Sequence, residues 1–127
     1  MYKNFKLTLT KLNDIYSYHE PYKILELIGM VKLYEFCFDQ ACKAIREILC
    51  HGGYAEEGID SSKRVLKMAY KAGMIDNEDL WLKALASREN IAYAYNKEVA
   101  VEIVNQIKEK YYDMFVCLEQ KIEQEWS

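Results

Sequence analysis

The sequence is poor in residues that interrupt regular structure, with one proline and five glycines among 127 residues. This composition excludes a collagen and a linker-rich chain of several domains. No stretch of about 18 uncharged apolar residues is present, so no membrane-spanning helix is expected. The segment 1–6 carries charges without a following apolar run, which argues against a secretory signal peptide. We therefore expect a cytoplasmic protein without a membrane partner.

Residues that build metal sites are also scarce. The four cysteines form no Cys-x-x-Cys pair, and the two histidines, His19 and His51, join no cluster of closely spaced ligands. We therefore expect neither a metal nor a cofactor. The net charge is −3, which argues against a protein that coats nucleic acid through general electrostatics. A local basic pocket stays open.

Apolar residues recur at helical spacing along the chain, and the alternation typical of strands is absent. Phe5, Leu9 and Leu12, for example, lie four and three residues apart. The pattern predicts helices over residues 2–17, 21–51, 62–73, 78–94 and 97–125, with a loop over 54–60. Long helices with short connections pack side by side. We expect one all-α domain over residues 1–127, an up-and-down antiparallel bundle of four or five helices.

The second predicted helix is the most apolar. Pro21 fits its first turn, where a missing N–H costs nothing, and Gly52 and Gly53 end it. Its apolar residues cover a wide arc, which requires cover on more than one side. We expect either a central place in the bundle or a second subunit against it. The apolar set is Ile24, Leu25, Ile28, Val31, Phe36, Phe38, Cys42, Ile45 and Leu49.

The most polar interruption of the buried pattern is the segment 87–96. On a helix, Arg88, Ala92 and Tyr95 share one face. An arginine beside tyrosines and asparagines offers donors for a phosphate or a carboxylate. The simpler alternative is an arginine that packs its stem and pairs with a glutamate. The candidate residues are Arg88, Asn90, Tyr93, Tyr95 and Asn96.

A pair of carboxylates precedes this segment. Glu35 and Asp39 stand four residues apart and face the same way on a helix, with Lys43 four further on. Paired carboxylates bind a metal, share a proton, hold an arginine from another helix or form a solvated face. No histidine or third carboxylate lies nearby, which favours the last two interpretations. Arg88 is a candidate partner.

Four segments in this order resemble the HEPN fold, and more narrowly the small bacterial subunit called nucleotidyltransferase substrate-binding protein. The first, Tyr34-Glu35-Phe36-x-Phe38-Asp39-x-Ala41-x-Lys43, is similar to the family's Phe-Glu-x-x-Phe-Glu-x-x-Trp-Lys run. The others are Val65-Leu66-x-x-Ala69-x-x-x-Gly73-Met74-Ile75, then Trp81-Leu82, then Arg88-x-Asn90-x-x-Tyr93-x-Tyr95-Asn96. The resemblance covers nearly the whole chain.

The resemblance implies a homodimer of helical bundles whose partner is a minimal nucleotidyltransferase of the MNT type. Many such pairs act as toxin and antitoxin. Active members are metal-independent ribonucleases with the motif Arg-x-x-x-x-His-x-Tyr. In some pairs the nucleotidyltransferase transfers AMP onto the motif tyrosine and silences the toxin.

Carried onto this chain, Arg88 matches the motif arginine, Tyr95 the tyrosine that accepts AMP, and Asn96 the polar residue that often follows. Tyr93 occupies the position of the histidine. A histidine titrates near pH 6.5 and serves as acid and base at neutrality, whereas tyrosine has a reference pKa near 10. Glu89 adds a carboxylate where RNA phosphates would lie. The ribonuclease motif is therefore degenerate.

Three functions follow from this resemblance. We favour a dimeric binding subunit that docks the nucleotidyltransferase and has lost nuclease activity, with RNA at most a weak partner. The first alternative is an active ribonuclease toxin that uses Arg88, with Tyr93 or His51 moving the proton. The second is a subunit that presents a small substrate to the nucleotidyltransferase. Glu35, Asp39, Asn90 and Asn96 are the candidate binding residues beside the motif.

Overall fold

The computed structural model describes residues 2–53 and 61–126. Within these ranges the chain forms helices joined by turns, and no strand. The α-helices are α1 Lys3–Leu12, α2 Ile24–His51, α3 Ser62–Lys71, α4 Glu78–Glu89, α5 Lys97–Gln106 and α6 Tyr112–Lys121. Tighter 3-10 turns follow α1 (Asn13–Ser17) and α4 (Asn90–Tyr93), and wider π turns follow α5 (Ile107–Tyr111) and α6 (Ile122–Trp126). The predicted loop over 54–60 lies outside the described residues.

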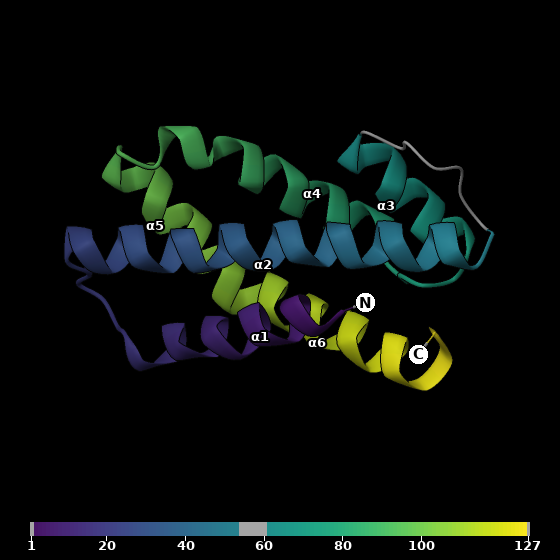
Figure 1. Cartoon of the computed structure of the whole chain (residues 1–127). Helices are drawn as coiled ribbons and strands as arrows, with labels where there is room; N and C mark the ends of the chain where they lie inside the picture. The colour runs from purple at the N-terminus through teal and green to yellow at the C-terminus, as the bar shows by residue number, and fades with distance from the viewer. Residues whose placement is uncertain (1, 54–60, 127) are drawn as a thin grey trace.

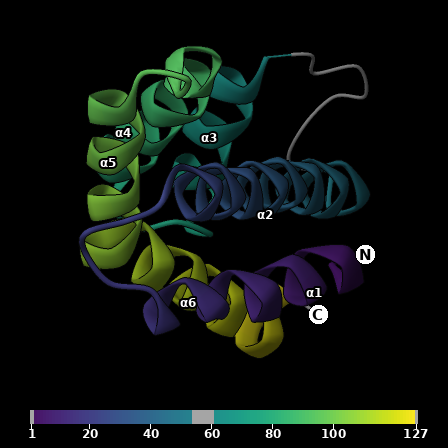
Figure 2. The same ribbon diagram turned by 90° about the vertical axis from the view of Figure 1, so that its left-hand side faces the viewer.

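The helices form the predicted up-and-down antiparallel bundle (Figure 1). The long helix α2 runs through the middle and packs on α1, α3, α4 and α5. Seen along α2, α1 and α6 lie on one side of it, and α3 and α4 on the other (Figure 2). The elements α5 and α6 and their π turns follow one another without interruption, as predicted for 97–125, so the bundle has five rods. No helix within 2–53 or 61–126 is long and apolar enough to cross a bilayer.

The start of α2 differs from the prediction. The Glu20–Pro21 peptide bond is cis, and the helix begins only at Ile24, so Pro21 precedes the helix instead of lying in its first turn. Lys23 has an extended backbone, and its N–H donates a hydrogen bond to the Glu26 carboxylate at 2.9 Å. This is the carboxylate half of a capping box, and it fixes the first turn at Ile24.

The predicted end of α2, both ends of α3 and the start of α4 are confirmed to within two residues. Gly53 and Gly73 follow α2 and α3 with φ of 76° and 80°, a backbone region that favours glycine at helix ends. The side chain of Asn77 accepts a hydrogen bond from the Leu80 N–H at 3.0 Å and caps α4. Ser61 precedes α3 without a capping bond from its side chain.

Two predicted helices end earlier than expected. The first is α-helical only to Leu12 and continues as a 3-10 turn. The fourth was expected to reach residue 94, but α4 ends at Glu89 and a 3-10 turn carries the chain to Tyr93. Asn96 must adopt an extended backbone to cap α5, with φ −80° and ψ 120°, so the α-helix cannot continue through it.

Aromatic side chains from four helices meet in the core. Phe115 of α6 lies 6.1 Å from Phe5 of α1, 6.0 Å from Tyr34 of α2 and 5.6 Å from Trp81 of α4, measured between ring centroids. Edge-on and tilted pairs at this separation add stability beyond the area that they bury. The ring of Tyr111, in the π turn, stacks on Tyr34 at 5.5 Å. This cluster fixes where α4 and the π turn lie against α2.

The first of the two predicted explanations for the apolar arc of α2, a central place in the bundle, is confirmed, although one patch of the helix stays uncovered by the described residues. Val31, Phe38, Ile45 and other inward residues are buried, but the outward face near the start of the helix is not. Ile24, Leu25, Ile28 and Phe36 are exposed, Leu25 to 79%. The bundle therefore covers α2 on several sides, and the described part of this chain leaves this outward patch near its start open.

Candidate functional site

The predicted arginine and the predicted carboxylate pair meet on the surface between α2 and α4. The Arg88 guanidinium donates to both oxygens of Asp39, from Nε at 2.8 Å and from Nη2 at 3.0 Å. A Glu35 oxygen lies 3.7 Å from Nη2. This two-pronged geometry is the strongest form of an arginine–carboxylate pair. It confirms the interpretation in which the carboxylates hold an arginine from another helix.

The fold positions this ion cluster through a neighbouring buried bond. The Tyr34 hydroxyl donates to the Ala84 carbonyl, one turn before Arg88 on α4. Tyr34 immediately precedes Glu35, so one turn of α2 supplies both the buried anchor and a member of the ion cluster. The hydrogen bond to Asp39, together with the charges of Asp39 and Glu35, raises the pKa of Arg88 above its ordinary value. The guanidinium is a permanent cation whose best donors are already occupied.

The two motif tyrosines follow the end of α4 and do not lie on the helix that carries Arg88. Because α4 ends at Glu89, Arg88, Ala92 and Tyr95 do not share one helical face, and that expectation is wrong. Tyr93 is 57% exposed and Tyr95 is 81% exposed, on the turn between α4 and α5. Their phenol rings are open to another molecule.

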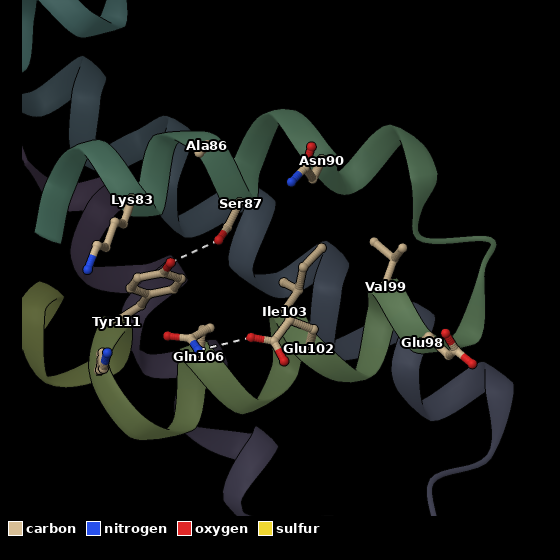
Figure 3. Close-up of a pocket in the computed structure, with 11 residues that line it drawn as sticks. Lys83, Ala86, Ser87, Asn90, Glu98, Val99, Glu102, Ile103, Gln106 and Tyr111 are labelled. Carbon is tan, nitrogen blue, oxygen red and sulfur yellow. Dashed lines mark hydrogen bonds between the residues drawn. The ribbon is translucent and has the colours of Figure 1, made fainter.

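The two candidate asparagines have different places. The Asn96 side chain accepts hydrogen bonds from the N–H groups of Glu98 and Val99, at 2.9 and 3.4 Å, and so caps α5. Its amide oxygen is committed to the helix end, which accounts for this residue without a ligand. Asn90 follows the last residue of α4, and its side chain faces a groove that the sequence did not predict (Figure 3).

This α4–α5 groove has a volume of about 550 Å³. One wall is α4 and the turn after it, and the other is α5 with the π turn (Figure 3). Ser87 and Tyr111 join the walls through a hydrogen bond of 2.8 Å between their hydroxyls. The polar lining residues are Lys83, Ser87, Asn90, Glu98, Glu102, Gln106, Lys110 and Tyr111.

The sequence did not reveal the groove because the residues of its two walls are 8–28 positions apart and each wall looks like an ordinary solvated face. One signal was present. Lys83, Ser87 and Asn90 recur at spacings of four and three, which places them on one side of α4 and of the turn that begins at its end. Arg88 lies off that face, and its bonds are with α2. The helix α4 therefore has two polar faces, one toward the ion cluster and one toward the groove.

The sequence of residues 1–124 matches the model of a protein family described as "Nucleotidyltransferase substrate binding protein like". The chain belongs to this family.

The fold agrees with this membership. A protein of Thermus thermophilus is similar in structure, with 21% identity, a TM-score of 0.74, and coverage of 94% of this chain and 97% of that chain. HI0074 from Haemophilus influenzae, described as revealing the fold of a substrate-binding domain of a nucleotidyltransferase, shares 17% identity with a TM-score of 0.73. That match covers 97% of this chain and 94% of HI0074. No curated protein matches the sequence.

In this member of the nucleotidyltransferase substrate-binding family, the ion pair with Asp39 limits how a phosphate could bind Arg88. A phosphate that approached Arg88 would compete with Asp39 for the same two donors. Glu35 also accepts from Lys32 at 3.1 Å, so the carboxylates are themselves neutralised. The charge of Arg88 is therefore balanced by neighbouring carboxylates at a partly exposed site.

We predict that Asp39→Asn strengthens the binding of inorganic phosphate next to Arg88 about threefold to tenfold, because it removes the competing charge from a half-exposed site. A titration with phosphate, followed through the NMR signal of the Arg88 Nε–H, measures this. Asp76→Asn is the matched control, since Asp76 pairs with Lys121 at 2.9 Å on another part of the molecule. Equal phosphate affinity in Asp39→Asn and wild type would show that Asp39 does not limit access to Arg88.

Proposed function

We propose that this chain, as a single helical-bundle domain of the HEPN type, is the dimeric partner subunit of an MNT-type nucleotidyltransferase. Its ribonuclease motif is degenerate in this proposal, and the pair is toxin–antitoxin-like. Family membership supports the link to a nucleotidyltransferase. The observation that carries the proposal is the state of the motif: Tyr93 replaces the histidine, and Arg88 is held by Asp39.

The loss of nuclease activity rests on acid–base chemistry. Cleavage at a ribose 2′-hydroxyl needs a group that accepts a proton near neutral pH, and a phenol is a poor base there. The alternative base, His51, ends α2 twelve residues beyond Asp39, which is about 18 Å along the helix axis. Within one chain, His51 is therefore out of hydrogen-bond reach of the Arg88 cluster.

The exposed face of α2 supports the homodimer. Ile24, Leu25, Ile28 and Phe36 lie on the same side of the helix as Glu35 and Asp39. A second copy that packs here by two-fold symmetry covers both apolar faces at once, because each patch meets its own equivalent. Glu35, Asp39 and Arg88 then lie beside the dimer interface, and the ion cluster borders the partner copy.

The role of Tyr95 follows from its exposure. Its phenol is open to the active site of another protein. In AMP transfer the Tyr95 oxygen would form a bond to the α-phosphorus of ATP, while the bond from that phosphorus to the bridging oxygen breaks and pyrophosphate leaves. The phenol proton goes to solvent. The added phosphate places negative charge on the turn that follows Arg88.

Presentation of a small substrate is the second candidate function. The α4–α5 groove favours it, since its volume of about 550 Å³ lies in the range of small-molecule sites. The active ribonuclease is the third candidate, and the cleavage assay below separates it from the proposal.

We predict that Leu25→Glu raises the dissociation constant of the homodimer at least about 100-fold, because a carboxylate would be buried without a partner in the interface. Light scattering over a concentration series measures this. Leu7→Glu is the matched control, since Leu7 is an exposed leucine, at 57%, on α1. A wild-type monomer, or a Leu25→Glu dimer of unchanged affinity, would contradict the interface on α2.

We predict that the wild-type protein does not cleave RNA in the absence of metal and that Tyr93→His gains cleavage. Restoring an acid–base group typically raises a rate about 10²–10⁴-fold. Adding Arg88→Ala to Tyr93→His should remove that gain. Cleavage of a labelled RNA in EDTA measures all of these. If the wild type cuts and Arg88→Ala alone abolishes the activity, the chain is a ribonuclease and the proposal is wrong.

We predict that the chain co-elutes with the minimal nucleotidyltransferase encoded beside it, and that adding ATP and Mg²⁺ increases its mass by one AMP unit. Intact mass spectrometry measures the modification. Tyr95→Phe should remain in the complex but not be modified, whereas Tyr93→Phe should behave as wild type. Absence of a complex between the two folded proteins rules out the partner, and modification of Tyr95→Phe rules out Tyr95 as the acceptor.

A further inference from the structure

We propose that the α4–α5 groove binds an elongated zwitterion, a small molecule with an anionic group at one end and a protonated amine at the other. The proposal gives a chemical class to the substrate-binding alternative. It holds whether or not the nucleotidyltransferase partner is found, because it rests on the lining of the groove alone.

The charges of the groove are sorted by sign along its length. Lys83 lies at the end near Tyr111, and Glu98 lies toward the other end, with Glu102 between Glu98 and Gln106 (Figure 3). Lys110 is in the π turn immediately before Tyr111, and so belongs to the end of Lys83. At about 1.5 Å per residue, Lys110 lies about 12 Å from Glu102 and about 18 Å from Glu98 along the rod.

The charged groups of the groove are available for a ligand. Within the described part of the chain, the side chains of Lys83, Lys110 and Glu98 form no ion pair and no hydrogen bond. Glu102 accepts from the Gln106 amide at 3.0 Å through one oxygen, which leaves its second oxygen for a ligand amine. This contrasts with Arg88 on the other face of α4, whose charge is satisfied by Glu35 and Asp39 of α2.

Two neutral amides also line the groove. The Asn90 amide lies on the α4 side, across from Ile103, and Gln106 lies on the α5 side, nearer Tyr111 (Figure 3). Amides donate and accept, so they match a polar linker between two charged ends. Val99 and Ile103 add an apolar part to the wall. A site of this kind orients a ligand through a few polar groups over an apolar surface.

The base of the groove is fixed in place. The hydroxyls of Ser87 and Tyr111 bond at 2.8 Å, and the Tyr111 ring stacks on Tyr34 in the core. Burial raises the pKa of Tyr111, so its hydroxyl stays protonated across the physiological range. The π turn Ile107–Tyr111 contributes Lys110 and Tyr111, and single π turns occur often at functional sites. A rigid base reduces the entropy that a ligand loses on binding.

Net charge decides between ligand classes. The two lysines and two glutamates sum to zero. A polyanion such as a nucleotide triphosphate would meet the glutamates, and a polyamine would meet the lysines, so each is repelled at one end. A zwitterion about 12 Å long meets an opposite charge at both ends. An extended tetrapeptide spans about 13 Å and carries one charge at each end.

Tetraalanine is therefore the probe, and NMR titration of the full chain is the measurement. We expect saturable shifts of amides in α4, α5 and the π turn. N-acetyl-tetraalanine lacks the amine and tetraalanine amide lacks the carboxylate. Each should bind about threefold to tenfold more weakly, as expected for one charge at a partly exposed site.

Variants assign the two ends. Lys110→Gln should weaken tetraalanine but not its amide, and Glu102→Gln should weaken tetraalanine but not the acetylated form. Lys67→Gln, at an exposed position on α3, is the matched control. The inference is overturned if tetraalanine gives no saturable shift, if its three forms bind equally, or if neither groove variant changes its affinity. None of these residues lies on the α2 face proposed for the dimer, so either proposal fails on its own.

Discussion

The position of Tyr34 is the constraint on which both polar faces of α4 depend. Its ring stacks on Tyr111 and lies against Phe115, and its hydroxyl donates to the Ala84 carbonyl. Burial raises the pKa of this phenol well above its ordinary value, so it acts as a donor at any physiological pH. A buried polar group needs its partner, because leaving it unpaired costs about 1–3 kcal/mol. The Ala84 carbonyl is therefore held at one height along α2.

The position of Ala84 along α2 determines which neighbours the next turn of α4 faces. Ser87 and Arg88 follow Ala84 within four residues and point to different neighbours. Ser87 meets Tyr111 and closes the base of the groove, whereas Arg88 meets Asp39 on α2. One buried hydrogen bond thus aligns a surface on which the charges are paired and a groove in which they are not. The two surfaces share an anchor but no charged residue.

The fold was predictable because the apolar spacing persists over long runs. The rods over 24–51 and 97–126 have the predicted extent to within a few residues. The helix ends were less predictable, because they depend on local hydrogen bonds. Glu26 fixes the start of α2 after Pro21, and Asn96 caps the start of α5 after the turn that follows Glu89. The pairing of Arg88 with Asp39 followed from two polar patches that a bundle brings together. The groove did not, since its walls meet only once α4 and α5 are packed.

The cap at the start of α5 has a consequence for how motifs of this kind are used in sequence searches. Asn96 scores as the last position of a nuclease-like pattern, yet its side chain is occupied by the N–H groups of Glu98 and Val99. Any protein that turns from α4 into α5 here needs a residue that caps a helix, whatever chemistry it performs. A search profile that counts this asparagine as catalytic evidence therefore records a requirement of the backbone.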